Sequence, residues 1–209
     1  MKPIFLFSLR YFFFPLTKIF VEKIEGEENI PKTNNFIIAP NHLNGRDHFF
    51  IGYTFKKNIR DIGFVGAMDK LKTFFQSGLL YYLGETIVIN RKKESREKII
   101  EKIQKEIKNN KIIVIYPEGD SNHKNRLLKG RTGIAELITK NIGVLPVGLR
   151  NGKRGRIISI GKLINFSQEI EELEKTKKES QYLILRKITD KIMNRISSLS
   201  KKPYLYEKN

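Results

Sequence analysis

The chain contains no cysteine among its 209 residues. Disulfide bonds, thiolate metal sites and a cysteine nucleophile are therefore excluded. Acidic residues are also few, since 22 Asp and Glu stand against 40 Lys and Arg and leave a net charge of +18. A positive field of this size attracts polyanions, so nucleic acid, an anionic membrane surface and phosphorylated substrates are all candidate partners.

A long uncharged apolar run is missing as well, and a membrane-spanning helix needs about 20 such residues. The most apolar stretch is residues 1–19, where Arg10 and Lys18 interrupt aromatic and aliphatic side chains. Pro15 is expected to break any continuous helix here into two short pieces, because it lacks the backbone N–H. Aromatic side chains flanked by basic ones suit the bilayer interface, so we expect residues 1–19 to be a membrane-associating segment. A helix packed on the protein core is the alternative.

Strands alternate with helices over residues 20–209, which is typical of an α/β domain. The nearly continuous apolar run at residues 111–116 predicts a strand covered on both faces in a parallel sheet. We therefore predict a single three-layer domain with a mostly parallel central sheet flanked by helices. Strands are expected at residues 20–25, 36–39, 61–66, 86–89, 111–116, 144–149 and 156–160, and helices at residues 71–83, 95–110, 130–140 and 168–199.

A histidine and an aspartate, His42 and Asp47, follow the strand expected at residues 36–39. Positions five apart point about 140° from each other on a straight helix, so only a turn would bring the two side chains together. The carboxylate would then accept from one ring nitrogen and leave the other as a neutral base, suited to removing a proton from an alcohol. A hydrogen-bonded surface histidine at a strand end is the plainer alternative.

Further polar residues follow two other expected strands, and ligands of such sheets gather at the carboxyl ends of strands. Arg91 offers a fork of donors that matches a phosphate, although an ion pair would also explain it. Gly119 lets the backbone approach a ligand closely, and Glu118 could accept hydrogen bonds from hydroxyls. An ordinary turn is the alternative for these two residues.

In their order and spacing these segments resemble the glycerolipid acyltransferases of the 1-acylglycerol-3-phosphate (lysophosphatidate) acyltransferase type. The resemblance covers roughly residues 20–165. The matching segments are residues 41–47 for the His-x4-Asp block, residues 84–91 for a second block that ends in arginine, Tyr116-Pro117-Glu118-Gly119 for a Phe-Pro-Glu-Gly-like block, and Val144-Leu145-Pro146-Val147 for an apolar fourth block.

The resemblance implies transfer of a fatty acyl group to the hydroxyl of a lysophospholipid, most simply 1-acylglycerol-3-phosphate, in phospholipid biosynthesis. Acyl-CoA or acyl-carrier protein would be the co-substrate, and no other cofactor is expected. His42 would be the general base and Asp47 would orient it. Arg91, Glu118 and Gly119 would hold the glycerol-phosphate end of the acceptor.

One departure concerns the acceptor, because Asp120-Ser121-Asn122 stands where the family usually continues Thr-Arg-Ser. Two unit charges about 4 Å apart interact by about 4 kcal/mol at an effective dielectric constant of 20, so Asp120 is expected to disfavour a dianionic acceptor. Lys124, Arg126 or Lys129 could supply the missing positive charge, and Lys129 is included in the predicted substrate site. A different lysolipid acceptor is the alternative.

No Gly-x-Ser-x-Gly elbow is present, so direct attack by the acceptor hydroxyl is expected, with donors for the developing oxyanion. Backbone amides near Asn41 or in the third block are candidate donors. His48 directly follows Asp47 at the expected start of a buried helix, which favours a structural role, and His123 could bind an anion. Neither forms a metal-ligand pattern with nearby Asp or Glu, so we predict no metal site.

These inferences predict a peripheral protein at the cytoplasmic face of a membrane, with the anionic membrane surface, a lysophospholipid and the acyl donor as partners. A basic nucleic-acid-binding protein is a competing hypothesis, supported by clusters at residues 124–131 and 150–156. We find no helix-turn-helix, aromatic RNA-binding pattern or zinc module, so no nucleic-acid partner is predicted. A catalytically silent lipid-binding relative is a third possibility, against which the His42 and Asp47 pair argues.

Overall fold

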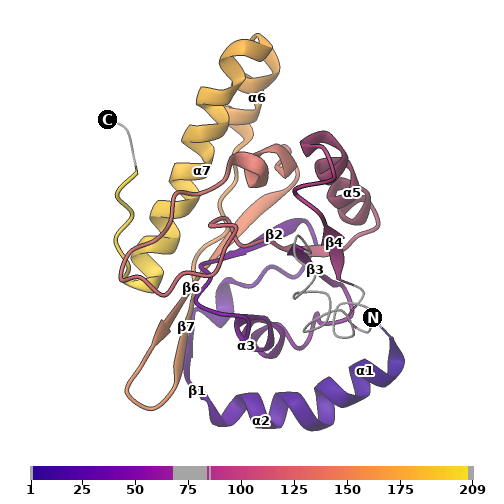
Figure 1. Cartoon of the computed structure of the whole chain (residues 1–209), viewed down its shortest axis with the longest axis vertical. Coiled ribbons are helices and arrows are strands. Elements are labelled where there is room, and N and C mark those ends of the chain that lie inside the picture. The colour runs from indigo at the N-terminus through magenta and orange to yellow at the C-terminus, as the bar shows by residue number, and fades with distance from the viewer. Residues whose placement is uncertain (1, 68–83, 85, 207–209) are drawn as a thin grey trace.

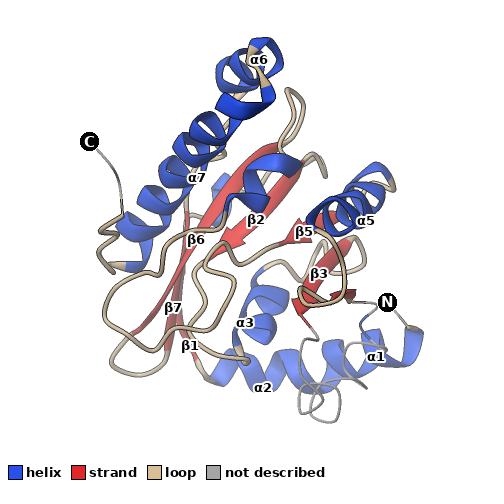
Figure 2. Ribbon diagram, turned by 45° about the horizontal axis from the view of Figure 1, so that its top comes forward, coloured by secondary structure: helices blue, strands red, loops and turns tan. Residues whose placement is uncertain are grey.

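A computed structural model describes residues 2–67, 84 and 86–206. Within this part of the chain, a seven-stranded sheet has the order β1-β7-β6-β2-β5-β3-β4 (Figures 1 and 2). Neighbouring strands are parallel except for the antiparallel pair β6 and β7. The strands are β1 (Val21–Glu25), β2 (Phe36–Pro40), β3 (Ile62–Ala67), β4 (Ile87–Ile89), β5 (Ile112–Val114), β6 (Gly143–Asn151) and β7 (Arg156–Ile160).

Helices cover both faces of this sheet, as a three-layer domain requires (Figure 2). One side carries α5, α6, α7 and the 3-10 helix η3, and the other carries α3 and the N-terminal helical residues (Figure 1). The predicted α/β domain with a mostly parallel sheet is thereby confirmed. The helical elements are α1 (Pro3–Ser8), the π-helix η1 (Leu9–Phe13), α2 (Phe14–Ile19), η2 (Glu27–Asn29), α3 (Asp47–Thr54), α5 (Arg96–Lys108), η3 (Thr132–Leu137), α6 (Ser167–Lys175) and α7 (Lys178–Ser200).

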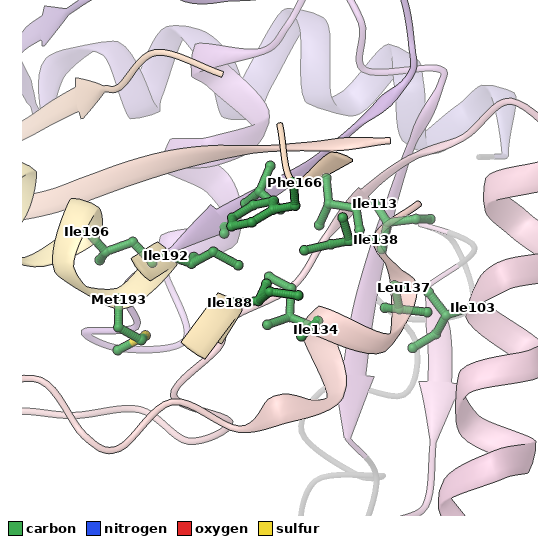
Figure 3. Close-up of a cluster of buried hydrophobic side chains, with 14 of the residues drawn as sticks. Ile103, Ile113, Ile134, Leu137, Ile138, Phe166, Ile188, Ile192, Met193 and Ile196 are labelled. Carbon is green, nitrogen blue, oxygen red and sulfur yellow. The ribbon is translucent and has the colours of Figure 1, made fainter. Parts of the chain in front are cut away.

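The central strands explain why the core has two halves. In β2, Ile37 and Ala39 belong to the cluster under α5 and α7, whereas Phe36 and Ile38 belong to the cluster under α3. Successive side chains of a strand point to opposite faces, so a strand that is apolar throughout must be covered twice. Figure 3 shows the first cluster, where residues of α7 such as Ile188 pack toward the sheet.

Three expectations about helices differ from the structure. The helix expected at residues 130–140 is only the 3-10 helix η3, and Gly130 before it packs against α7, where an added Cβ would collide with Met193. The helix expected at residues 168–199 divides into α6 and α7 because Thr176 is extended, and Gln181 bonds the carbonyl oxygens of Leu173 and Thr176 at 3.1 Å. The helix expected at residues 71–83 lies outside the described residues.

The third difference is at the N-terminus, where Pro15 does not separate two helical pieces. Residues 3–19 are helical throughout, and the turns before Pro15 form the π-helix η1. The N–H of Phe14 donates to the carbonyl of Leu9, five residues back. This wider turn spaces the backbone so that the proline, which cannot donate, is accommodated at the start of α2. We call residues 3–19 the N-terminal helical segment.

Candidate active site

The first part of the site is the turn between β2 and α3. The Nδ1 atom of His42 lies 2.9 Å from Oδ2 of Asp47, and the backbone amides of Leu43 and Asn44 donate to the same oxygen at 2.6 and 2.8 Å. The carboxylate thus folds the turn around itself and brings together two side chains that a straight helix would separate. Because Nδ1 faces the carboxylate, the remaining ring nitrogen of His42 is the one able to take up a proton.

Asp47 is completely buried, so its negative charge is held close to the imidazole without water in between. Its second oxygen, Oδ1, accepts no hydrogen bond, but Nη2 of Arg156 lies 3.9 Å away. Burial lowers the pKa of Arg156, and the charge of Asp47 acts in the opposite direction. Arg156 comes from β7 and was not predicted to belong to the site, since only the fold brings it here.

The segment Tyr116-Pro117-Glu118-Gly119, the third of the four matching blocks, holds this turn in place. Glu118 is 3% exposed, and its Oε1 accepts the backbone N–H of His42 at 2.9 Å, while Oε2 accepts the side chain of Asn122 and the N–H of Leu128 at 2.8 Å each. The N–H of Asn122 donates in turn to the carbonyl of His42 at 2.7 Å. Glu118 therefore joins two loops and is not among the residues that line the cavity described below, and its contact with the acceptor stays a prediction.

Asn41 also turns away from the pocket. Its side chain donates to the carbonyl of Leu149 at 3.0 Å and accepts the N–H of the same residue at 2.6 Å. These paired bonds fasten the end of β2 to β6, and they occupy both polar atoms of a completely buried amide. Asn41 thus holds the backbone directly before His42, and its contact with the substrate stays a prediction.

A cavity of about 1050 Å³ opens in front of His42. Its lining includes five basic residues, which we call the basic rim, and the two acids Glu94 and Asp120. The basic residues are Arg91, Arg96, Lys129, Arg131 and Arg186. Another part of the lining is apolar and comes from β3, β4, α5, η3 and the residue that directly follows β5. The apolar lining includes Val65, Ala67, Ile89, Ile99, Ile100, Ile103, Ile115 and Leu137. The cavity thus combines positive charge with an apolar wall, an arrangement that suits a ligand with an anionic head and an apolar tail.

Two arginines converge on the loop that carries Gly119 and Asp120. Arg91 donates to the carbonyl of Gly119 at 2.9 Å and lies 3.5 Å from Asp120, and Arg131 donates to Asp120 at 2.9 Å. Gly119 has φ of +75°, and a Cβ there would collide with the Arg131 guanidinium. Glycine is therefore needed both for the left-handed backbone and for the close passage of Arg131. Arg131 was not among the predicted site residues, although its position near the Pro117-Glu118-Gly119 segment was a usable signal.

Of the three cations expected to replace the missing charge, the cavity wall includes Lys129 alone. Lys124 and Arg126 are exposed, do not line this cavity, and belong to the loop fastened by Asn122. His123 is exposed on the same loop. His48, in contrast, lines the cavity beside His42, with 6.0 Å between the ring centroids.

Neither a metal site nor a membrane span is found in the described residues. Nowhere in residues 2–67, 84 and 86–206 do three His, Asp or Glu side chains gather as metal ligands would. Of the helices in these same residues, none combines the length and apolar character needed to cross a bilayer.

Comparisons with known proteins address the family. A crystal structure of the 1-acyl-sn-glycerophosphate (LPA) acyltransferase PlsC from Thermotoga maritima has a similar fold, with a TM-score of 0.59 and 20% sequence identity over 94% of this chain and 79% of that chain. None of the curated proteins compared with the chain matches it. The family model described as Acyltransferase matches residues 22–150, which is more than half of the chain. The chain therefore belongs to the acyltransferase family.

Proposed function

We propose that this acyltransferase moves a fatty acyl group from a thioester donor to the hydroxyl of a lysophospholipid, with 1-acylglycerol-3-phosphate as the acceptor. The observation that carries this proposal is the His42 and Asp47 pair at a cavity whose lining combines basic and apolar side chains. PlsC, which shares the fold, is a 1-acyl-sn-glycerophosphate acyltransferase, which agrees with this acceptor. The donor is acyl-CoA or acyl-carrier protein.

The chemistry follows from the geometry of the pair. The free ring nitrogen of His42 takes the proton of the acceptor hydroxyl as its oxygen attacks the thioester carbonyl carbon. Asp47, held by three hydrogen bonds, fixes the ring and stabilises the imidazolium that forms. Collapse of the tetrahedral intermediate expels the thiolate, which receives the proton from His42. The products are the ester and the free thiol.

The acceptor phosphate is placed at the basic rim by charge. Arg91 and Arg131 point their guanidinium groups toward the same loop, and Lys129 lines the cavity nearby. Asp120 neutralises part of this charge, so a phosphate must compete with an internal carboxylate for the two arginines. The competition is modest because both Asp120 and Arg131 are more than half exposed to solvent.

The N-terminal helical segment supplies a membrane-binding surface in this proposal. Leu9 and Phe14 are buried in the core, but Phe12 and Ile19 are 75% and 73% exposed. Seven of the ten exposed large apolar side chains of the described residues belong to residues 4–20. The basic residues Arg10 and Lys18 lie in the same stretch of the chain. The protein is accordingly a peripheral membrane protein, on the cytoplasmic face where acyl-CoA and acyl-carrier protein are found.

Matched substitutions test this surface. Phe12→Glu with Ile19→Glu should reduce binding to anionic phospholipid vesicles about tenfold or more in a sedimentation assay, because two apolar anchors are replaced by anions. Leu183→Glu is the control, since this side chain is 71% exposed on α7, away from the segment. Equal binding of the double variant and the control would remove the segment from membrane attachment.

The decisive assay for the activity uses a panel of lysolipid acceptors, with acyl-CoA and acyl-carrier donors in parallel. The proposal expects ester formation on 1-acylglycerol-3-phosphate that His42→Ala abolishes. Transfer to another lysolipid alone would revise the acceptor, and no transfer from either donor to any acceptor would overturn the proposal.

A further inference from the structure

The acyl transfer proposed above needs hydrogen-bond donors for the oxyanion, and many backbone amides near His42 are already engaged. Five of these amides donate to an oxygen of the protein. The pairs are Asn41 with the Val147 carbonyl, His42 with Glu118, Leu43 and Asn44 with Asp47, and Gly119 with the Tyr116 carbonyl. These amides build the turn and the loop. A side chain that lines the cavity is therefore a candidate donor to the oxyanion.

His48 is a side chain that can donate a hydrogen bond, and it lies close to His42. It lies in the first turn of α3, lines the cavity, and has its ring centroid 6.0 Å from that of His42. The ring stacks on Phe64 at 5.3 Å and on Tyr116 at 5.2 Å, and Tyr116 also stacks on His42 at 4.2 Å. Aromatic packing thus fixes the orientation of both imidazoles relative to each other.

The contact between Tyr116 and His48 is compatible with a proton on Nε2 of His48. The phenolic oxygen lies 3.4 Å from Nδ1 of His48. When this hydroxyl donates, Nδ1 is the acceptor and the ring proton is on Nε2. Burial, reinforced by the neighbouring His42, lowers the pKa of His48 to about 4, so the ring is neutral at physiological pH. A neutral imidazole can donate a hydrogen bond without placing a second cation beside His42.

We propose that the Nε2–H of His48 donates a hydrogen bond to the thioester carbonyl oxygen as that oxygen becomes negatively charged. The acceptor oxygen forms its bond to the carbonyl carbon, the carbonyl electron pair moves to oxygen, and the hydroxyl proton goes to His42. His48 keeps its own proton throughout and only stabilises the oxyanion. When the carbonyl re-forms and the carbon–sulfur bond breaks, the hydrogen bond weakens again.

Two variants separate donation from packing. His48→Phe keeps an aromatic ring between Phe64 and Tyr116 but removes the donor, and it should lower kcat about 10²-fold to 10³-fold, the loss typical of one oxyanion donor, with acceptor KM within about twofold. His48→Gln restores a side-chain N–H donor and should recover at least about tenfold in kcat over His48→Phe. Thermal unfolding of both variants checks that they are folded. Tyr116→Phe is the milder control, expected to lower kcat less than tenfold.

The outcomes distinguish this assignment from the function on which it rests. An active wild-type enzyme with kcat unchanged in His48→Phe, or with His48→Gln no better than His48→Phe, would overturn the role of His48 alone. A wild-type enzyme without transfer to any acceptor would overturn the proposed function and this role with it. Nitrogen-15 NMR of the imidazoles provides a measurement without turnover. It should show His48 as the neutral Nε2–H form from pH 5.5 to 8, and an imidazolium or an Nδ1–H form at pH 7 would contradict the proposal.

Discussion

The turn that carries His42 and the rim that carries Arg131 belong to one cavity but are built in different ways. At His42, the backbone N–H, the backbone carbonyl and the ring are each held by a hydrogen bond to a buried residue. At the rim, Asp120 and Arg131 form an ion pair whose side chains are 59% and 55% exposed. Buried hydrogen bonds fix a geometry and are costly to lose, whereas exposed ion pairs contribute little and are screened by salt. Under the proposed function, the catalytic pair is therefore rigidly positioned, and the residues that would recognise the acceptor are adjustable.

The largest effect is expected at His42. His42→Ala removes the base and should lower kcat about 10³-fold to 10⁴-fold, the upper part of the range for general acid–base catalysis. The variant should remain folded because the two backbone bonds of residue 42 remain, with a lower melting temperature because the ring's bond to buried Asp47 is lost. His123→Ala is the matched control, since His123 is exposed and lies outside the cavity wall. Substantial residual activity in His42→Ala, measured by steady-state acyl transfer, would sink the base assignment.

Asp47→Asn should come second, with kcat lowered about 10²-fold to 10³-fold. The amide oxygen can still accept from Leu43 and Asn44, but it no longer carries the charge that stabilises the imidazolium. Circular dichroism should show a folded protein. A variant with kcat within a factor of about three of wild type would remove Asp47 from the mechanism.

The burial of His48 also predicts that the stability of the protein depends on pH. The pKa of His48 is about 4 in the folded state against 6.5 for an ordinary histidine, so only the unfolded chain binds the proton between these values. Unfolding is then favoured as the pH falls from about 6.5 towards 4, and the free energy of unfolding should decrease by about 2 kcal/mol between pH 7 and pH 4.5 from this group.

His48→Phe isolates this contribution, since other groups titrate in the same range. Urea unfolding at several pH values should give the variant a shallower decline in stability than wild type below pH 6.5. Parallel curves for the two proteins would mean that His48 titrates normally in the folded state.

The smallest effects belong to the exposed rim. Asp120→Asn removes the competing carboxylate and should lower the KM for a phosphate-bearing acceptor about threefold to tenfold, with kcat nearly unchanged. Arg131→Gln should raise the same KM by a similar factor. Both effects should shrink as salt increases, because exposed charges are screened.

Glu136→Gln is the control for the rim, because it also removes an acid paired with an arginine of the cavity, Arg96, but not one between Arg91 and Arg131. It should leave the acceptor KM within about twofold of wild type. A KM that rises in Asp120→Asn would show that the carboxylate assists the acceptor instead of competing with it.

The fold could be predicted because its signals are local and repeated. An apolar strand such as β2 predicts a sheet that is covered on both faces. The isoleucines of α5 recur at helical spacing and predict a helix. The failures have equally physical causes. Pro15 was expected to interrupt a helix, but the choice of a π-turn depends on how Leu9 and Phe14 pack in the core. A pattern of residue types does not predict such packing.

The site divides in a similar way. The sequence indicated that a turn would be needed to bring His42 and Asp47 together. The structure contains this turn and the hydrogen bond between the two side chains. It could not show that Glu118 faces the inside of the loop or that Arg156 from β7 lies near Asp47, because these contacts join residues far apart in the chain. His48 illustrates the remaining gap, since the sequence indicated the start of a buried helix but not the stacking on Phe64 and Tyr116 at the cavity wall.

The central claim is that the imidazole and the carboxylate work as one catalytic unit on a lysolipid hydroxyl. A double-mutant cycle with His42→Ala, Asp47→Asn and the double variant, assayed for acyl transfer to 1-acylglycerol-3-phosphate, tests it most directly. Because an orienting carboxylate is useless without its base, the double variant should be no slower than His42→Ala alone. Losses that simply multiply in the double variant would contradict the account.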